Sequence, residues 1–234
     1  MENQIQTTQK FRLLGLIYVL VILLAGFSQG YVREVIFIPG DPATSASNIL
    51  ENEGLFRIGL IADLLAFLLD AVISVMLYLL FKPYGKMLAL VSSSLRLLAH
   101  PAIGTLNLLN HYLALHVLKT ETLSNSFDPS QLESLSHLFL ETHHYGYLIA
   151  GAFFGVHCVL LGLQLIRSGI FPKILGALMV LAGLGYLIET FGDFAFPGNE
   201  SLFAWIVGIS AALGEVTLDL YLLIKGSKIK STTS

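Results

Sequence analysis

Long apolar runs alternate with short polar segments along the whole chain, and six of the runs are long enough to cross a bilayer. A hydrocarbon core about 30 Å thick needs about 20 predominantly apolar residues in a helix. The pattern therefore predicts an all-α fold, a polytopic membrane helix bundle in which residues 1–234 form one integral membrane domain. The predicted transmembrane helices cover residues 13–32, 55–81, 87–111, 143–166, 174–191 and 203–224.

Two features between and before these runs need interpretation. The first run follows basic residues, as a signal peptide would, but it is longer than a usual signal core and no clean cleavage site follows it. We interpret it as the first span. Residues 129–140 follow an N-cap at Asp128 and repeat Leu and Phe at helical spacing, which predicts an amphipathic helix on the membrane surface.

The loop charges are sorted by side. Two basic residues, Arg33 and Lys119, fall with ten acidic residues on one side. The basic residues of the other side are Lys10, Arg12, Lys82, Lys86, Arg167, Lys173, Lys225, Lys228 and Lys230. Because cytoplasmic loops carry an excess of Lys and Arg, the pattern predicts that both termini are cytoplasmic.

The composition agrees with this fold class and limits the chemistry. The chain is 55% hydrophobic and 12% charged, whereas soluble domains carry roughly 25% charged residues. Its one cysteine, Cys158, lies in an apolar run, which excludes a disulfide framework and a cysteine-based metal site. No H-E-x-x-H, G-x-S-x-G, Walker or Rossmann pattern occurs. We expect the lipid bilayer as a partner and no nucleic acid.

Ionisable residues interrupt the apolar runs, and they are costly in hydrocarbon unless they are paired or hydrated. Counting inward at about 1.5 Å per residue places four of them, from four spans, at roughly 13–17 Å, near the bilayer midplane. These four are Asp70, Arg96, His157 and Glu215. By the same count Asp219 lies one turn nearer the cytoplasm, and His100, Glu189 and then Asp63 lie progressively farther from it.

Two interpretations of this polar interior stay open. In the first, Asp70 and Arg96 form a structural ion pair that lets two helices pack. In the second, a hydrated cavity is lined by Asp63, Asp70, Arg96, His100, His157, Glu189 and Glu215. His143 and His144 open the fourth span, where a histidine is either an interfacial residue or a ligand. Small-residue spacings at Gly151-x-x-x-Gly155 and Gly208-x-x-x-Ala212 favour close helix packing.

Several motifs resemble those of domain of unknown function family 4386, a group of bacterial multi-pass integral membrane proteins. The first half carries Glu53-x-x-Phe56-Arg57-x-Gly59-x-x-x-Asp63-Leu64, Lys82-Pro83 and Lys86-x-Leu88-Ala89-Leu90. The second half carries His144-x-Gly146-Tyr147, Phe153-Phe154-Gly155 and Pro172-Lys173-Ile174-Leu175-Gly176. The resemblance implies a multi-pass protein of the bacterial inner membrane and no established activity, so no catalytic residue is assigned. Within these motifs Arg57, Asp63 and His144 are the titratable positions to test first.

We therefore expect a membrane protein that binds or carries a small polar or amphipathic ligand, with proton coupling as one form of this. The candidate site residues are Arg57, Asp63, Asp70, Arg96, His100, His144, His157, Glu189, Glu215 and Asp219. One alternative is an intramembrane lipid hydrolase that uses His, Asp and a metal. Others are a structural or partner-binding membrane protein and a haem protein that uses paired histidines on two spans. The sequence assigns neither a metal nor any other cofactor, nor an oligomeric state.

Overall fold

The computed structural model describes the backbone of residues 2–225 and the side chains of residues 10–225. Lys228 and Lys230 of the predicted basic tail lie outside the described residues. Helices joined by short turns make up this part of the chain, and no strand occurs in it. The all-helical prediction is confirmed, and six of its helical stretches are long and apolar enough to cross a membrane.

The first three spans are each built from more than one helical segment. The first contains α1 (Glu2–Phe27), the π-helical turn η1 (Ser28–Val32) and α2 (Arg33–Ile36). The short helix α3 (Pro42–Glu51) leads into the second, which is α4 (Glu53–Phe81) with the turn η2 (Lys82–Tyr84). The third contains α5 (Lys86–Leu97), the π-helical η3 (Leu98–Gly104) and α6 (Thr105–Lys119). The first helical stretch thus continues beyond the predicted end at residue 32, and Arg33 is part of it.

The last three spans follow the short helix α7 (Glu121–Ser124). The fourth is α8 (Pro129–Ser168) and the fifth is α9 (Lys173–Ala195). The sixth contains α10 (Glu200–Ala211), the π-helical η4 (Ala212–Val216) and α11 (Thr217–Lys225). The segment 129–140, predicted as a separate surface helix, is the first part of α8. Its N-cap is confirmed: Asp128 forms a capping box with Gln131.

The outer connection between the first two spans is fixed by a local cap. Asp41 precedes the proline at the start of α3 and accepts hydrogen bonds from the Thr44 hydroxyl (2.7 Å) and the Thr44 backbone N–H (3.0 Å). Both bonds lower the pKa of the Asp41 carboxyl, and the bond from the hydroxyl has the larger effect. Asp41 is therefore the N-cap of α3.

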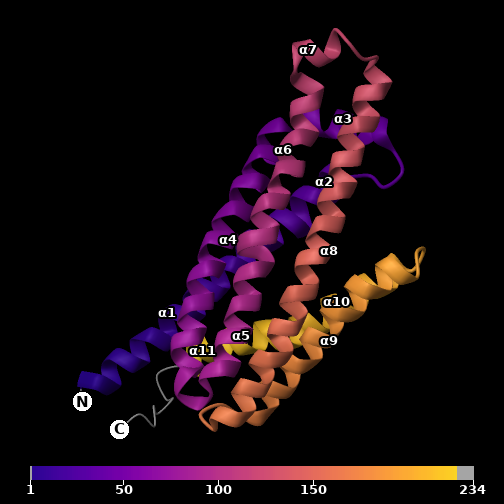
Figure 1. Ribbon diagram of the computed structural model, residues 1–234. Coiled ribbons are helices and arrows are strands. Elements are labelled where there is room, and N and C mark those ends of the chain that lie inside the picture. The colour runs from indigo at the N-terminus through magenta and orange to yellow at the C-terminus, as the bar shows by residue number, and fades with distance from the viewer. Residues whose placement is uncertain (1, 226–234) are drawn as a thin grey trace.

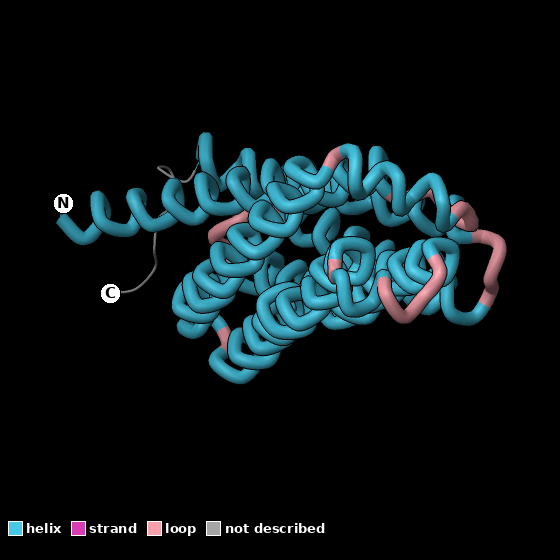
Figure 2. Tube along the Cα trace, turned by 90° about the horizontal axis from the view of Figure 1, so that it is seen from above, coloured by secondary structure: helices cyan, strands magenta, loops and turns pink. Residues whose placement is uncertain are grey.

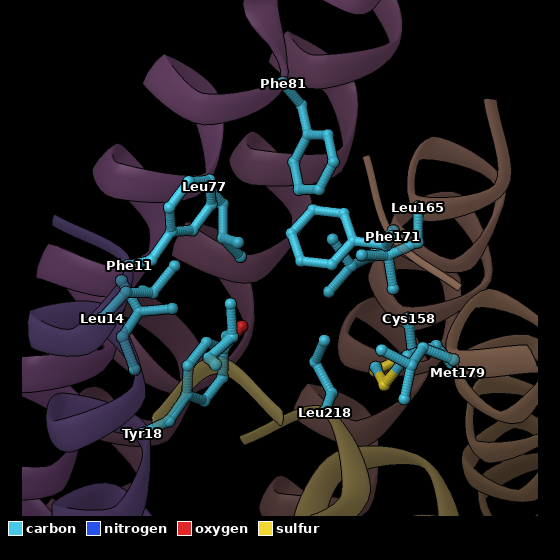
Figure 3. Packing of buried hydrophobic residues seen from close by; sticks show 14 of the residues in the cluster. Phe11, Leu14, Tyr18, Leu77, Phe81, Cys158, Leu165, Phe171, Met179 and Leu218 are labelled. Carbon is cyan, nitrogen blue, oxygen red and sulfur yellow. The ribbon is translucent and has the colours of Figure 1, made fainter. Parts of the chain in front are cut away.

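An apolar cluster joins the ends of four spans at one end of the bundle, which we call the inner end (Figure 3). Phe11 of α1 and Phe81 of α4 each lie 6.0 Å, centroid to centroid, from Phe171 in the turn between α8 and α9. Leu222 of α11 belongs to the same cluster. The beginning of the first span and the end of the sixth therefore lie at the same end of the bundle, as an even number of crossings requires, and α1 packs against α11 there (Figure 1).

The helices α8 and α9 pack closest, because glycines face each other across them. A Cβ added to Gly162 would lie 2.5 Å from the carbonyl oxygen of Gly176. A Cβ added to Gly183 would lie 2.5 Å from the carbonyl oxygen of Gly155. These glycines let the two backbones touch. By contrast, a Cβ on Gly208 would meet nothing within 4 Å. The predicted packing role of small residues thus applies to Gly155 and does not apply to Gly208.

The outer surface of the bundle is apolar, and the helices are not parallel throughout. Leu106 and Trp205 are 70% and 72% exposed, which suits a lipid-facing surface. The α1 helix packs against α4 and α11. In Figure 1, α10 leans away from α1 toward the end opposite the termini, and the view in Figure 2 shows the helices crossing at an angle.

Candidate functional site: a charged cavity at the centre of the bundle

Arg96 of α5 is the centre of a buried polar cluster halfway along the bundle. Its guanidinium forms an ion pair with Asp70 of α4, donating to Oδ1 from Nε at 2.9 Å and also from Nη2. Nη1 donates to the hydroxyl of Tyr18 and to Nε2 of His157, each at 3.2 Å. Arg96 and Asp70 are each 2% exposed. The ion pair proposed from depth counting is therefore confirmed. The cluster around Arg96 connects four spans.

His157 of α8 is held in one tautomer by this cluster. Its Nδ1 lies 2.9 Å from the carbonyl oxygen of Ser92, which can only accept, so Nδ1 carries the hydrogen. Nε2 then accepts from Arg96. Both ring nitrogens are thus engaged, and His157 acts as a structural support of Arg96.

Asp70 keeps one oxygen free. Its Oδ2 is buried and has no hydrogen-bond partner among the residues that the structure describes. Nδ1 of His100 lies 3.8 Å away, beyond hydrogen-bond length. The ring of His100 packs between aromatic side chains, with centroids 5.7 Å from Phe67 and 4.8 Å from Phe154. An acceptor atom without a donor is costly to bury, so this oxygen marks the place where a ligand or water would bind.

A cavity of about 350 Å³ lies beside this oxygen, and we call it the central cavity. Its polar wall consists of Gln29, Asp70, Arg96, His100, Tyr147, Tyr186 and Glu215. Glu215 accepts a hydrogen bond of 2.7 Å from the hydroxyl of Tyr186. The rest of the wall is apolar, with Val21 and Ala25 of α1 on one side and Ala211 and Val216 of the sixth span on the other.

Three π-helical turns supply three of the seven polar residues of this wall. Gln29 lies in η1, His100 in η3 and Glu215 in η4, and each lines the central cavity. A π-helical turn is rare and is frequently found at functional sites. Pro101 explains one of the three, since its ring removes a backbone donor inside η3.

A second ion pair lies on the side of the central cavity toward the end of the bundle opposite the inner end, which we call the outer end. Arg33 of α2 donates from Nη2 to Asp63 Oδ2 at 2.9 Å, and Gln29 donates from Nε2 to both Asp63 oxygens at 3.1 Å. The Arg33 guanidinium lies 5.2 Å from the ring centroid of Tyr147. The sequence analysis placed Arg33 in a loop, which is wrong. The first helix continues through η1 and carries Arg33 into the bundle.

Beyond this pair lies a cavity of about 400 Å³ that we call the outer cavity. Gln29 lines both cavities. Glu189, predicted in one cavity with Asp70, lines the outer cavity instead, with His144 and Asp193. The predicted single cavity is therefore two. Gln29, which lines both cavities, bonds to Asp63, and Asp63 pairs with Arg33 in the wall of the outer cavity.

The remaining predicted residues lie apart. Arg57 is on the surface, where its side chain is 55% exposed and pairs with Glu53 at 2.8 Å. It belongs to neither cavity. Asp219 is 1% exposed on α11, and neither of its carboxylate oxygens has a hydrogen-bond partner among the described residues.

The histidines that the haem alternative would pair are bound by other groups of the protein. His111 and His143 pack edge to face with centroids 5.5 Å apart. The Nε2 of His111 bonds to the carbonyl oxygen of Phe56 and the Nδ1 of His143 to that of Asn107, each at 3.0 Å, and both ring nitrogens of His157 are engaged in the Arg96 cluster. No group of three or more His, Cys, Asp or Glu residues suited to a metal ion occurs over residues 10–225.

Comparison with known proteins places the chain in a family. The model of the domain of unknown function DUF4386 matches residues 13–226. The chain belongs to this family. An uncharacterized protein of Archaeoglobus fulgidus is 30% identical to this DUF4386 protein over 170 residues, which cover 73% of the chain and 85% of the relative. No solved structure matches.

The family match confirms the resemblance drawn from the motifs, and it states no activity. The motif residues have different roles in this DUF4386 protein. Asp63 closes the central cavity and His144 lines the outer one, whereas Arg57 forms a surface ion pair. Gln29, Arg33, Tyr147 and Tyr186 were missed. Gln29 and Arg33 had one signal in the sequence, because they are polar residues at the end of an otherwise apolar run.

Proposed function

We propose that this multi-pass membrane protein binds a small amphipathic ligand in the central cavity. The observation that carries the proposal is the convergence of the three π-helical turns on one cavity wall. Three separate spans give up regular hydrogen bonding at the places where they meet this cavity. Packing of the helices does not require irregular turns at these places, and irregular turns of this kind are frequent at ligand sites.

The chemistry of the wall specifies the ligand class. Asp70 Oδ2 and the Glu215 carboxyl can accept hydrogen bonds, while Arg96 is already occupied by Asp70, Tyr18 and His157. The matching ligand carries a donor such as a hydroxyl or amine. The apolar remainder of the wall suits a hydrocarbon part, and about 350 Å³ limits that part to a short one.

The ligand enters from the side. Val21 and Ala25 of the first span and Ala211 and Val216 of the sixth line the central cavity together. We therefore infer that the cavity opens to the lipid between these two spans. An amphipathic molecule dissolved in the bilayer would reach Glu215 by this route.

We extend the proposal to transport and to membrane orientation. Asp219, one turn beyond Glu215 and without a partner, is the candidate proton-holding group of a carrier. The loop charges favour cytoplasmic termini, and the family resemblance favours the inner membrane of a bacterial cell.

Native mass spectrometry of the detergent-purified protein tests the binding proposal. We expect a co-purifying small molecule that is lost from Asp70→Asn and retained by the control Glu121→Gln, which changes an exposed acid on α7. Coupling to protons predicts that Asp219→Asn removes the pH dependence of binding. Binding that is unchanged in both variants at every pH would contradict the proposal, and a wild-type protein without any bound molecule would favour a structural role.

A further inference from the structure

The outer cavity contains buried acceptor atoms that no donor satisfies, and they point to a second site. His143 is 3% exposed and Asp193 is 8% exposed, and both line this cavity. The Nε2 atom of His143 and the Oδ1 atom of Asp193 have no hydrogen-bond partner among the described residues. The same wall also holds an unpartnered buried donor, the Nε atom of Arg33. The two unpartnered acceptors indicate that a ligand supplies the donors that they lack.

The role of His143 Nε2 follows from the other ring nitrogen. Nδ1 lies 3.0 Å from the carbonyl oxygen of Asn107, which accepts only, so Nδ1 is the donor. In the neutral imidazole Nε2 therefore carries the lone pair. Asn107 also donates from its Nδ2 to the backbone carbonyl oxygen of His143 at 2.7 Å, which fixes the backbone at this residue. The ring, held at Nδ1, presents Nε2 as an acceptor.

The charges of the outer cavity favour a cation. Its acidic residues are Glu34, Glu189, Asp193 and Glu200. Its arginine, Arg33, is already paired with Asp63, which lies outside this cavity wall. A cationic donor would meet both the negative charge and the unpartnered acceptors.

We propose that the outer cavity binds the primary ammonium group of a small organic amine, with His143 Nε2 and Asp193 Oδ1 accepting its hydrogen bonds. An ammonium provides three donors and a positive charge in one group. Val32, Ile36, Phe56 and Leu140 form an apolar wall that would hold the amine's hydrocarbon part. The site is distinct from the central cavity, from which Gln29, Arg33 and Asp63 separate it.

Isothermal titration of the detergent-purified protein with hexylammonium tests this site. Hexanol, hexanoate and hexyltrimethylammonium are matched probes that lack the charge, reverse it, or keep it without N–H donors. We expect hexylammonium to bind at least about tenfold more tightly than each of the others, because charged hydrogen bonds are involved. Equal binding of hexanol, of hexanoate or of the trimethyl compound, or no binding of hexylammonium, would overturn the proposal.

Variants locate the amine. Asp193→Asn should weaken hexylammonium binding at least about tenfold. Glu189→Gln, on the same cavity wall and partly exposed, should weaken it less and serves if the first variant fails to fold. Asp70→Asn, which changes the central cavity, should leave hexylammonium binding unchanged. The amine site can therefore fail or succeed independently of the central-cavity proposal. Unchanged binding in both outer-cavity variants, or loss of it in Asp70→Asn with retained folding, would contradict the assignment. Stoichiometric displacement of the amine by zinc or calcium would indicate a metal site instead.

Discussion

The inner end of the bundle and its centre are held together by different interactions. At the inner end, Phe11, Phe81, Phe171 and Leu222 fill the space between the spans with apolar atoms. From the centre outward, ion pairs and histidine–backbone hydrogen bonds connect the helices, and two cavities remain between them. Among the buried side chains described, those with an unpartnered polar atom lie in this part, except Asp219.

This difference separates the task of holding the helices from the task of binding. The inner end fixes where the spans lie, since close-packed apolar groups tolerate little displacement. The centre can then keep polar atoms unsatisfied and backbone turns irregular without loss of the fold. Variants on the two sides of this division should behave differently, and the predictions below begin with the largest expected effect.

Removing one member of the central ion pair should have the largest effect on stability. Arg96→Gln leaves the Asp70 carboxylate buried without its cation, which costs about 3–5 kcal/mol of unfolding free energy. The double variant Asp70→Asn with Arg96→Gln should recover part of the lost unfolding free energy, because it leaves no unpaired charge buried. Denaturant unfolding in detergent measures both. A single variant as stable as the wild type would show that the centre contributes nothing to holding the spans.

A side chain at the closest helix contact should have the next largest effect. In Gly162→Leu the added atoms meet the carbonyl oxygen of Gly176 across α8 and α9. Overpacking of this kind costs about 1–3 kcal/mol. Gly208→Leu is the matched control, because open space surrounds that position. Equal thermal stability of the two variants would contradict the packing described for α8 and α9.

A single hydrogen bond between neutral groups should have a smaller effect. The Thr190 hydroxyl of α9 donates to the Leu148 carbonyl oxygen of α8 at 2.9 Å. Thr190→Val keeps the shape and removes the donor, at a cost of about 1 kcal/mol. Thr122→Val, at an exposed position, is the control and should leave the unfolding midpoint unchanged. A loss as large as that of Arg96→Gln would mean that α8 and α9 are held by polar contacts rather than by close packing.

An exposed ion pair should have the smallest effect. Glu53 pairs with Arg57 and Lys119 at the outer end, where the two cations are 55% and 48% exposed. Glu53→Gln should leave the unfolding free energy nearly unchanged, because water screens the pair. The same measurement on Asp70→Asn provides the contrast between exposed and buried pairs. A loss of similar size in both would remove the distinction between the surface and the centre.

The number of spans and the Asp70–Arg96 pair could be predicted from the sequence for physical reasons. Run length sets the spans, and a fixed rise per residue places Asp70 and Arg96 at the same height. Their pairing was expected because an unpaired charge in hydrocarbon is costly. Arg33 was misplaced because the apolar run ends one residue before it. The helix nevertheless continues through η1, where Gln29 and Arg33 turn toward Asp63.

The division into two cavities could not be predicted, because depth gives height in the bundle and not the side a residue faces. Glu189 was assigned to the central cavity by its height, yet it lines the outer cavity. The π-helical turns have no reliable signal in one sequence, apart from Pro101 in η3. Helical spacing likewise cannot show that Gly208 faces open space while Gly155 touches α9.

The claim on which the account depends is that a polar, water-accessible cavity lies at the centre of the lipid-facing bundle. Cys158 is buried, so single-cysteine variants in a Cys158→Ser background can report on this directly. The measurement is the rate of reaction with a small water-soluble thiosulfonate in membranes, for Ala25→Cys in the cavity wall and Leu213→Cys on the exposed surface. The account predicts that Ala25→Cys reacts and that Leu213→Cys, surrounded by acyl chains, does not. Equal rates at the two positions, or reaction at Leu213→Cys alone, would contradict it.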